Sequence, residues 1–235
     1  MKYISGGYYI VTPIKRPGYM DKDLIPDTIL SISECICDFH PEINVLWGQS
    51  DEEKHKYVQK LNISQNIYEE IEQWVGEKFE AGIFAYPQVF TTIELAKEFL
   101  YNFLYHLTDA KIIGIGLPET YVKEFLENEE FQNEPEEKQY GIEKLILDRI
   151  RIEEKDSKMI GYEVLGFEFG GFHSYLCNGL EKDYKKHFGF TLNENGFISS
   201  LEEAIRFCDY ANDEKVGTEP VLWLPWGIFD YLHKS

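Results

Sequence analysis

The chain has 235 residues, of which 43% are hydrophobic, 15% aromatic and 28% charged. This composition is typical of a folded globular protein rather than a disordered chain, and the length is sufficient for one large domain or two small ones. Lys and Arg number 23 against 42 Asp and Glu, which gives a formal net charge of −19. Because phosphates and anionic lipids would be repelled by this charge, we expect neither nucleic acid nor a membrane as a partner.

The cysteines and the N-terminal sequence indicate the cellular compartment. Four cysteines in a chain of this length are too sparse for a secreted, disulfide-stabilised domain. The N-terminal residues lack the apolar stretch of a signal peptide, and no apolar run approaches the ~20 residues needed to cross a bilayer. We therefore predict a cytoplasmic protein with reduced thiols.

The first part of the chain is predicted to contain strands followed by helices. Runs of β-branched and aromatic residues indicate strands, whereas apolar residues at helical spacing after Ser or Thr indicate helices. The expected elements are, in chain order, strands at 8–12 and 28–36, helices at 51–61, 65–79 and about 92–107, a strand at 111–117 and a helix at about 118–126.

The second part begins with an ambiguous segment, 141–154, whose pattern fits a helix and a strand equally, so both alternatives stay open. Glycines within the next apolar run predict a strand with a bulge or a close neighbour. The expected elements after this segment are a strand at 159–169, a helix at 176–188 that ends at a left-handed Gly189, a helix from Ser200 to about Ala211 and a strand at 221–224.

These elements predict an α+β protein with a mixed β-sheet and helices packed mainly on one face. The acidic, proline-bearing stretch 127–139 lacks apolar periodicity and is expected to be an exposed loop. We predict a single domain over 1–235. The alternative is a subdivision into two closely apposed halves, 1–126 and 140–235, around that loop.

The main catalytic candidates lie at the predicted junction between a strand and a helix. A thiol in the first turn of a helix can have a lowered pKa, and a nearby imidazole can accept its proton. Cys177 is therefore the candidate nucleophile, with His173 as the base and Glu168 as the carboxylate that orients the base. The alternative is structural, with Ser174 as a helix cap and Cys177 as a small core residue.

Two further motifs do not predict a metal or a cofactor. Cys35, Cys37 and His40 have the donor types that zinc prefers, but no second Cys/His pair lies at the usual spacing. The segment 114–119 places glycines after a strand, as a dinucleotide-binding turn does, but Glu119 occupies the position of the third glycine. We interpret this segment as a tight turn, and we predict no metal and no cofactor.

Four aromatic residues are candidates for binding a partner, since they lie beside prolines or in a predicted loop. Large aromatic rings supply contact area in protein interfaces, and neighbouring carboxylates would attract a basic partner. The alternative is that these rings fill the core. The candidates are Trp47, Tyr86, Trp223 and Trp226.

An acidic α+β composition without catalytic motifs has the general character of bacterial immunity proteins, an analogy of composition that no motif supports. We expect a non-enzymatic, protein-binding role of immunity or regulatory type, in which a basic protein is captured. The alternative is a small hydrolase or transferase that uses Cys177 and His173 in a cleft lined by Trp223 and Trp226; a purely structural subunit is a third option. The binding hypothesis requires the negative charges to gather on one side of the molecule, and the sequence indicates no oligomeric state.

Overall fold

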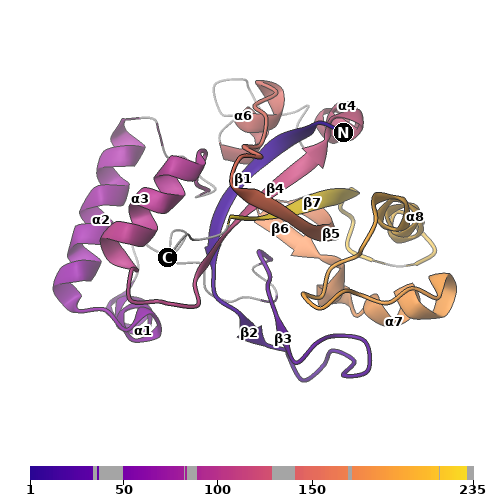
Figure 1. Ribbon diagram of the computed structural model, residues 1–235, viewed down its shortest axis with the longest axis horizontal. Coiled ribbons are helices and arrows are strands. Elements are labelled where there is room, and N and C mark those ends of the chain that lie inside the picture. Colours follow the sequence, from indigo (N-terminus) through magenta and orange to yellow (C-terminus); the bar gives the residue numbers. More distant parts are fainter. Residues whose placement is uncertain are drawn as a thin grey trace.

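A five-stranded β-sheet forms the centre of the protein (Figure 1). The computed structural model describes residues 1–33, 36, 50–81, 83, 89–128, 141–168, 171–216 and 218–231, without the side chains of Glu53 and Asn178. The order across the sheet is β1-β4-β7-β5-β6, and each neighbouring pair is antiparallel. The strands are β1 (Tyr3–Val11), β4 (Lys111–Pro118), β5 (Ser157–Glu168), β6 (Gly171–Ser174) and β7 (Trp223–Tyr231).

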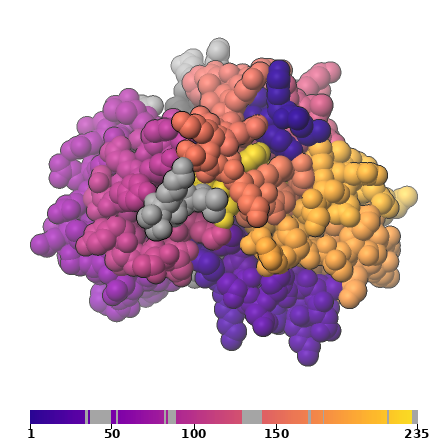
Figure 2. All heavy atoms as spheres, viewed as in Figure 1, coloured from indigo at the N-terminus to yellow at the C-terminus, as the bar shows by residue number. Residues whose placement is uncertain are grey.

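The sheet joins strands from both parts of the chain. β4, which precedes the stretch 127–139, pairs with β7, which follows it. A separate two-stranded sheet contains β2 (Ile14–Lys15) and β3 (Thr28–Ile29). The segment that carries β2 and β3 lies along the lower edge of the space-filling view in Figure 2.

Side-chain caps define the start of three helices. Ser64, Thr92 and Ser200 each accept a hydrogen bond from a backbone N–H in the first turn. None of the described helices is long and apolar enough to cross a bilayer. The α-helices are α1 (Asp51–Leu61), α2 (Gln65–Glu80), α3 (Ile93–Phe103), α4 (Val122–Glu127), α6 (Gly141–Leu147), α7 (Glu181–Asp183) and α8 (Leu201–Ala211). Shorter segments are the 3₁₀-helices Glu119–Tyr121 and Tyr175–Asn178 and the π-helical turn Tyr184–Phe188.

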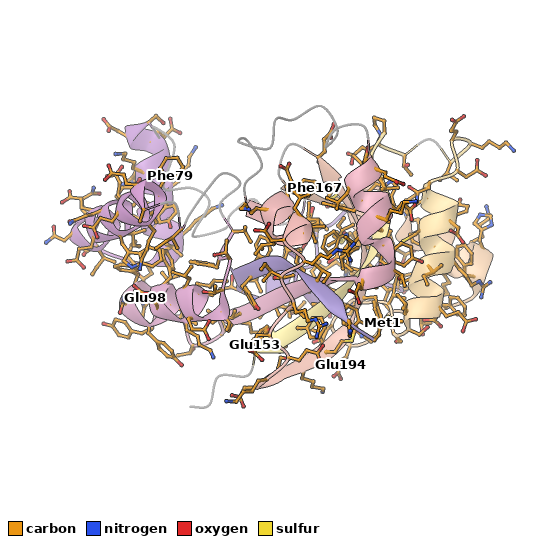
Figure 3. All side chains as sticks on the ribbon, turned by 90° about the horizontal axis from the view of Figure 1, so that it is seen from above. Met1, Phe79, Glu98, Glu153, Phe167 and Glu194 are labelled. Carbon is orange, nitrogen blue, oxygen red and sulfur yellow. The ribbon has the colours of Figure 1, made fainter. Side chains whose placement is uncertain are left out.

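Apolar residues of β1 and β4 alternate between two clusters on opposite faces of the sheet. Tyr8 and Ile112 belong to the cluster that contains residues of α1, α2 and α3. Tyr9 and Ile113 belong to the cluster that contains residues of α4 and α6, while a third cluster packs α8 against β5 and β7. Seen from above in Figure 3, α2 and α3, which carry Phe79 and Glu98, lie at one end of the molecule.

The predicted α+β class is confirmed. Every described strand pair is antiparallel, so the sheet is more regular than the mixed sheet that we expected. Most helices lie on one face of the sheet, as predicted: α1, α2, α3 and α8 pack with Trp223, Phe229 and Tyr231, which alternate to the same face of β7. Helices α4 and α6 cover the other face.

Several helices and strands have other boundaries than those predicted from the sequence. The helix expected at 176–188 is divided, because Gly179 adopts the left-handed conformation with φ 68°. Gly189 ends the second part with φ 71°, as predicted. The ambiguous segment 141–154 begins with helix α6, and among the described residues of 28–36 strand pairing is limited to β3.

Strand β7 is longer than the predicted strand at 221–224 because Pro225 does not interrupt it. The pairing between β4 and β7 starts at Gly116 and Gly227, so the missing N–H of Pro225 lies beyond the end of that ladder. On the other side of β7, Pro225 lies opposite Val164 of β5. β5 carries the irregularity predicted from its glycines at Met159–Gly161.

Candidate functional site

Ser174 connects three structural elements at the end of β6. Its backbone N–H donates to the Ser33 Oγ at 3.2 Å, and its own Oγ accepts from the Leu176 N–H at 3.2 Å. The same hydroxyl donates to Glu163 Oε1 at 2.5 Å. Ser174 therefore caps the 3₁₀-helix Tyr175–Asn178, as the structural alternative predicted, and also binds a buried carboxyl group on β5.

Glu163 lies inside the molecule, with an exposed fraction of 2%. It is opposite Trp226 in the pairing of β5 with β7. Burial raises the pKa of the Glu163 carboxyl to about 7, although the hydrogen bond from Ser174 opposes this rise. Its second oxygen, Oε2, has no hydrogen-bond partner among the described residues.

The catalytic candidates have separate sets of described contacts. Cys177 is half-buried, and its Sγ lies 3.3 Å from Ser33 Oγ. The His173 Nε2 lies 3.7 Å from Oε2 of Glu168, the residue proposed from the sequence to orient the base. The His173 Nδ1 lies 3.2 Å from Glu219 Oε2. These contacts place carboxylates near both ring nitrogens of His173 and a serine hydroxyl near the sulfur of Cys177.

Trp223 and Trp226 are core residues, and their prediction as binding residues is corrected. Both have an exposed fraction of 0%, because they point to opposite faces of β7 and each face is covered. The Trp226 ring packs edge-on against Phe172 at a centroid distance of 4.9 Å. The Trp223 Nε1 donates to Thr218 Oγ1. These side chains therefore fill the core, and they do not line an open cleft.

Several other candidates lie outside the described residues: Trp47, Tyr86, Cys35, Cys37 and His40. Within the described ranges, no group of three or more His, Cys, Asp or Glu side chains is arranged to hold a metal ion.

Acidic side chains border two adjoining hollows near the start of β7. Glu124, Glu127 and Leu222 line the first hollow. The second is lined by residues 211–214 and 218–221, which include Asp213, Glu214 and Glu219. Val221 and Leu222 are consecutive, so the two hollows adjoin. We call Glu124, Glu127, Asp209, Asp213, Glu214 and Glu219 the acidic surface.

Helices α4 and α8 come together at Tyr121, which links the two parts of the acidic surface. Burial raises the pKa of Tyr121, and the neighbouring Cys208, Asp209 and Glu124 raise it further. Two of these neighbours lie on α8 and one lies on α4. The carboxylates of both helices therefore act on the same region.

Most carboxylates of the acidic surface lack a neutralising partner. Within the part of the chain that the structure describes, Glu124, Asp209, Asp213 and Glu214 form no ion pair, and all four are exposed. Three basic residues lie in these elements: Lys123 pairs with Glu127 at 3.4 Å, Arg206 lies over the rings of Phe188 and Phe190, and Lys215 is exposed beside Glu214. The negative charge of this region is therefore only partly compensated.

The burial of Glu163 and the contact of Glu219 with His173 were not predicted from the sequence. A signal for Glu163 was present, because it alternates with Leu165 and Phe167 on the apolar face of its strand. Glu219 lies far from His173 along the chain, and only the fold brings the two together. Comparisons with protein-family models, curated proteins and solved structures find no match.

Proposed function

We propose that this protein binds a basic protein partner through the acidic surface, in a non-enzymatic role of immunity or regulatory type. The observation that carries this proposal is a group of exposed carboxylates that form no ion pair with any described residue: Glu124, Asp209, Asp213 and Glu214. Uncompensated charge of one sign attracts an oppositely charged protein before contact and raises the association rate.

The same region also supplies apolar contact area. Val221 and Leu222 are half-buried and lie between the carboxylates of the two hollows, and Pro220 is exposed. Interfaces combine an apolar centre with a polar or charged rim, because burial of apolar area supplies affinity while charges supply orientation. This arrangement fits a basic partner whose contact surface has an apolar side chain surrounded by Lys or Arg.

The enzyme alternative receives less support from the described geometry. Nucleophilic catalysis requires the base within hydrogen-bond reach of the nucleophile. Among the described contacts, the sulfur of Cys177 lies near Ser33, and the ring of His173 lies near Glu168 and Glu219. In addition, the tryptophans expected to line the cleft are buried.

Affinity capture from the native cell lysate at about 0.05 M and about 0.5 M salt tests the proposal, since the Debye length shortens severalfold over this range. The double variant Asp209→Lys with Asp213→Lys reverses charge on the acidic surface. The matched control, Glu69→Lys with Glu70→Lys, makes the same change on exposed positions of α2.

We expect wild type and control to retain the same cationic protein at low salt and to lose it at high salt, whereas the acidic-surface variant retains much less of it at low salt. Retention that is insensitive to salt contradicts the proposal, as does the absence of any retained cationic protein. Equal loss in both variants assigns the attraction to net charge and removes the role of the acidic surface.

A further inference from the structure

The carboxyl group of Glu163 is buried with only one hydrogen-bond partner. Ser174 Oγ donates to Oε1, whereas Oε2 is buried and has no partner among the described residues. No Lys, Arg or His in the described ranges forms an ion pair with Glu163. An unpaired carboxylate in a protein interior costs several kcal/mol. The interior therefore favours the neutral acid.

Within the described residues, no positively charged side chain forms an ion pair with Glu163. From β7, the indole Nε1 of Trp226 is buried and also lacks a hydrogen-bond partner. The hydroxyl of Tyr175 lacks a partner as well, and burial, together with the charge of Glu163, raises the pKa of Tyr175 well above its usual value. The other titratable groups that adjoin Tyr175 or Ser33 are Tyr184, Glu181 and Cys177. All of these groups are neutral or negative. The basic residue of β6, His173, has its described contacts with Glu168 and Glu219.

Ser174 connects the carboxyl group of Glu163 to an edge of the sheet. β6 is the edge strand and contains only Gly171–Ser174. The segment 31–33 reaches this edge through Ser33, which contacts both the Ser174 N–H and the Cys177 sulfur. Short edge elements open at a lower free energy than central strands do. Opening here is therefore the least costly way to give an ionised Glu163 access to water.

We propose that Glu163 is a pH-controlled latch: its neutral form keeps β6, the 3₁₀-helix Tyr175–Asn178 and residues 31–33 docked on the sheet, and its ionisation lets water enter between them. This device does not depend on the binding of a basic partner. Because the group binds its proton more tightly in the folded state, the docked form loses stability as pH rises from the ordinary value of 4.5 to about 7. Above that range, Glu163 causes no further change.

Amide hydrogen exchange followed by mass spectrometry tests this latch. Exchange of residues 171–178 is measured at pH 5 and pH 8 and is corrected for the intrinsic effect of pH, with α3 as an internal reference. Wild type is compared with Glu163→Gln, which keeps the acceptor for Ser174 and removes the ionisation. We expect protection of 171–178 in wild type to fall at least about tenfold, the equivalent of one pKa unit. Protection in the variant stays constant, and protection in α3 of wild type falls much less than that of 171–178.

The matched control is Glu202→Gln, an exposed position on α8, which follows wild type if the effect belongs to the buried carboxyl. Glu163→Leu provides a second neutral side chain if the glutamine variant does not fold. The same fall in protection in wild type and in the neutral variant overturns the proposal. A fall in α3 equal to that in 171–178 also overturns it, because it indicates global loss of stability.

Discussion

The two ends of the molecule carry their acidic residues in different ways. On the helices α1, α2 and α3, lysines bridge to neighbouring acids: Lys54 to Glu72 at 3.1 Å and Lys78 to Glu98 at 3.2 Å. On the acidic surface, four exposed carboxylates have no such bridge within the described residues. A net charge of −19 is thus a poor guide to the local field. Glu70, Glu80 and Glu94 at the first end are also exposed and form no ion pair within the described residues, so the two ends differ in how many of their carboxylates are paired, and neither end is fully paired.

The interiors of the two ends differ as well. Under α2 and α3, aromatic rings pack edge to face, with Phe99 at 5.4 Å from Trp74 and 5.2 Å from Phe103. Near the start of β7, the interior contains the Glu163 carboxyl and its Ser174 partner. The first end should therefore respond to loss of apolar volume, and the second to pH.

Phe99→Ala should produce the largest effect. Phe99 is fully buried, and removal of its ring leaves a cavity among aromatic neighbours. We expect a loss of about 3–5 kcal/mol in the free energy of unfolding, measured by chemical denaturation. Tyr105→Ala is the control, because that ring is 75% exposed and should change stability by less than about 0.5 kcal/mol. A loss below about 1 kcal/mol for Phe99→Ala would mean that α3 is not held by this cluster.

Glu163→Gln should remove the pH dependence that the buried carboxyl imposes on global stability. The folded pKa of about 7 lies above the ordinary value of 4.5, so wild type loses stability as pH rises between these values. The full shift corresponds to roughly 3 kcal/mol, an upper value that local opening reduces. Chemical denaturation at pH 5 and pH 8 measures the free energy of unfolding of both proteins. Relative to wild type, the variant should be more stable at pH 8 than it is at pH 5. If the free energy of unfolding changes with pH in the same way in both proteins, the prediction is contradicted.

Helix caps give a comparison that is independent of net charge. Ser64 caps α2 and Ser200 caps α8 through the same contact: the serine Oγ accepts a hydrogen bond from the backbone N–H three residues later. Ser64→Ala and Ser200→Ala should each cost about 1 kcal/mol, measured by thermal or chemical unfolding. Unequal costs would indicate that one of these helices unfolds separately from the rest.

Local sequence signals predicted the helices well because their start signals are local. Ser64, Thr92 and Ser200 marked the starts of α2, α3 and α8. The sequence was less informative about β7, since tolerance of Pro225 depends on where the pairing with β4 ends.

The candidate site was predicted less well, because its contacts connect residues that are distant in sequence. Glu168 and His173 lie on paired strands close together in the chain, and their contact was predicted. Ser33 and Glu219 approach the junction from other parts of the fold. The sequence pattern also could not show whether Trp223 and Trp226 are buried or exposed, because both lie near Pro225. Their burial depends on which elements cover β7 in the folded protein.

The smallest effects should have opposite signs at the two ends. The Trp74 indole N–H and the Lys78 ammonium both donate to Glu98 and lower its pKa, so its contribution to stability is present at neutral pH and is lost in acid. Glu98→Gln should therefore reduce stability at pH 7 by about 0.5 kcal/mol. Asp209 lies unpaired in the last turn of α8, where the helix dipole and neighbouring carboxylates disfavour a negative charge.

Asp209→Asn should accordingly raise stability by a few tenths of a kcal/mol at low salt. Added salt should shrink both differences, because both residues are exposed to solvent. Precise thermal unfolding at two salt concentrations measures both variants against wild type. Destabilisation by Asp209→Asn would show that a positive charge compensates this carboxylate in solution. The acidic surface would then attract a cation no more strongly than the Lys–Glu pairs of α1, α2 and α3 do.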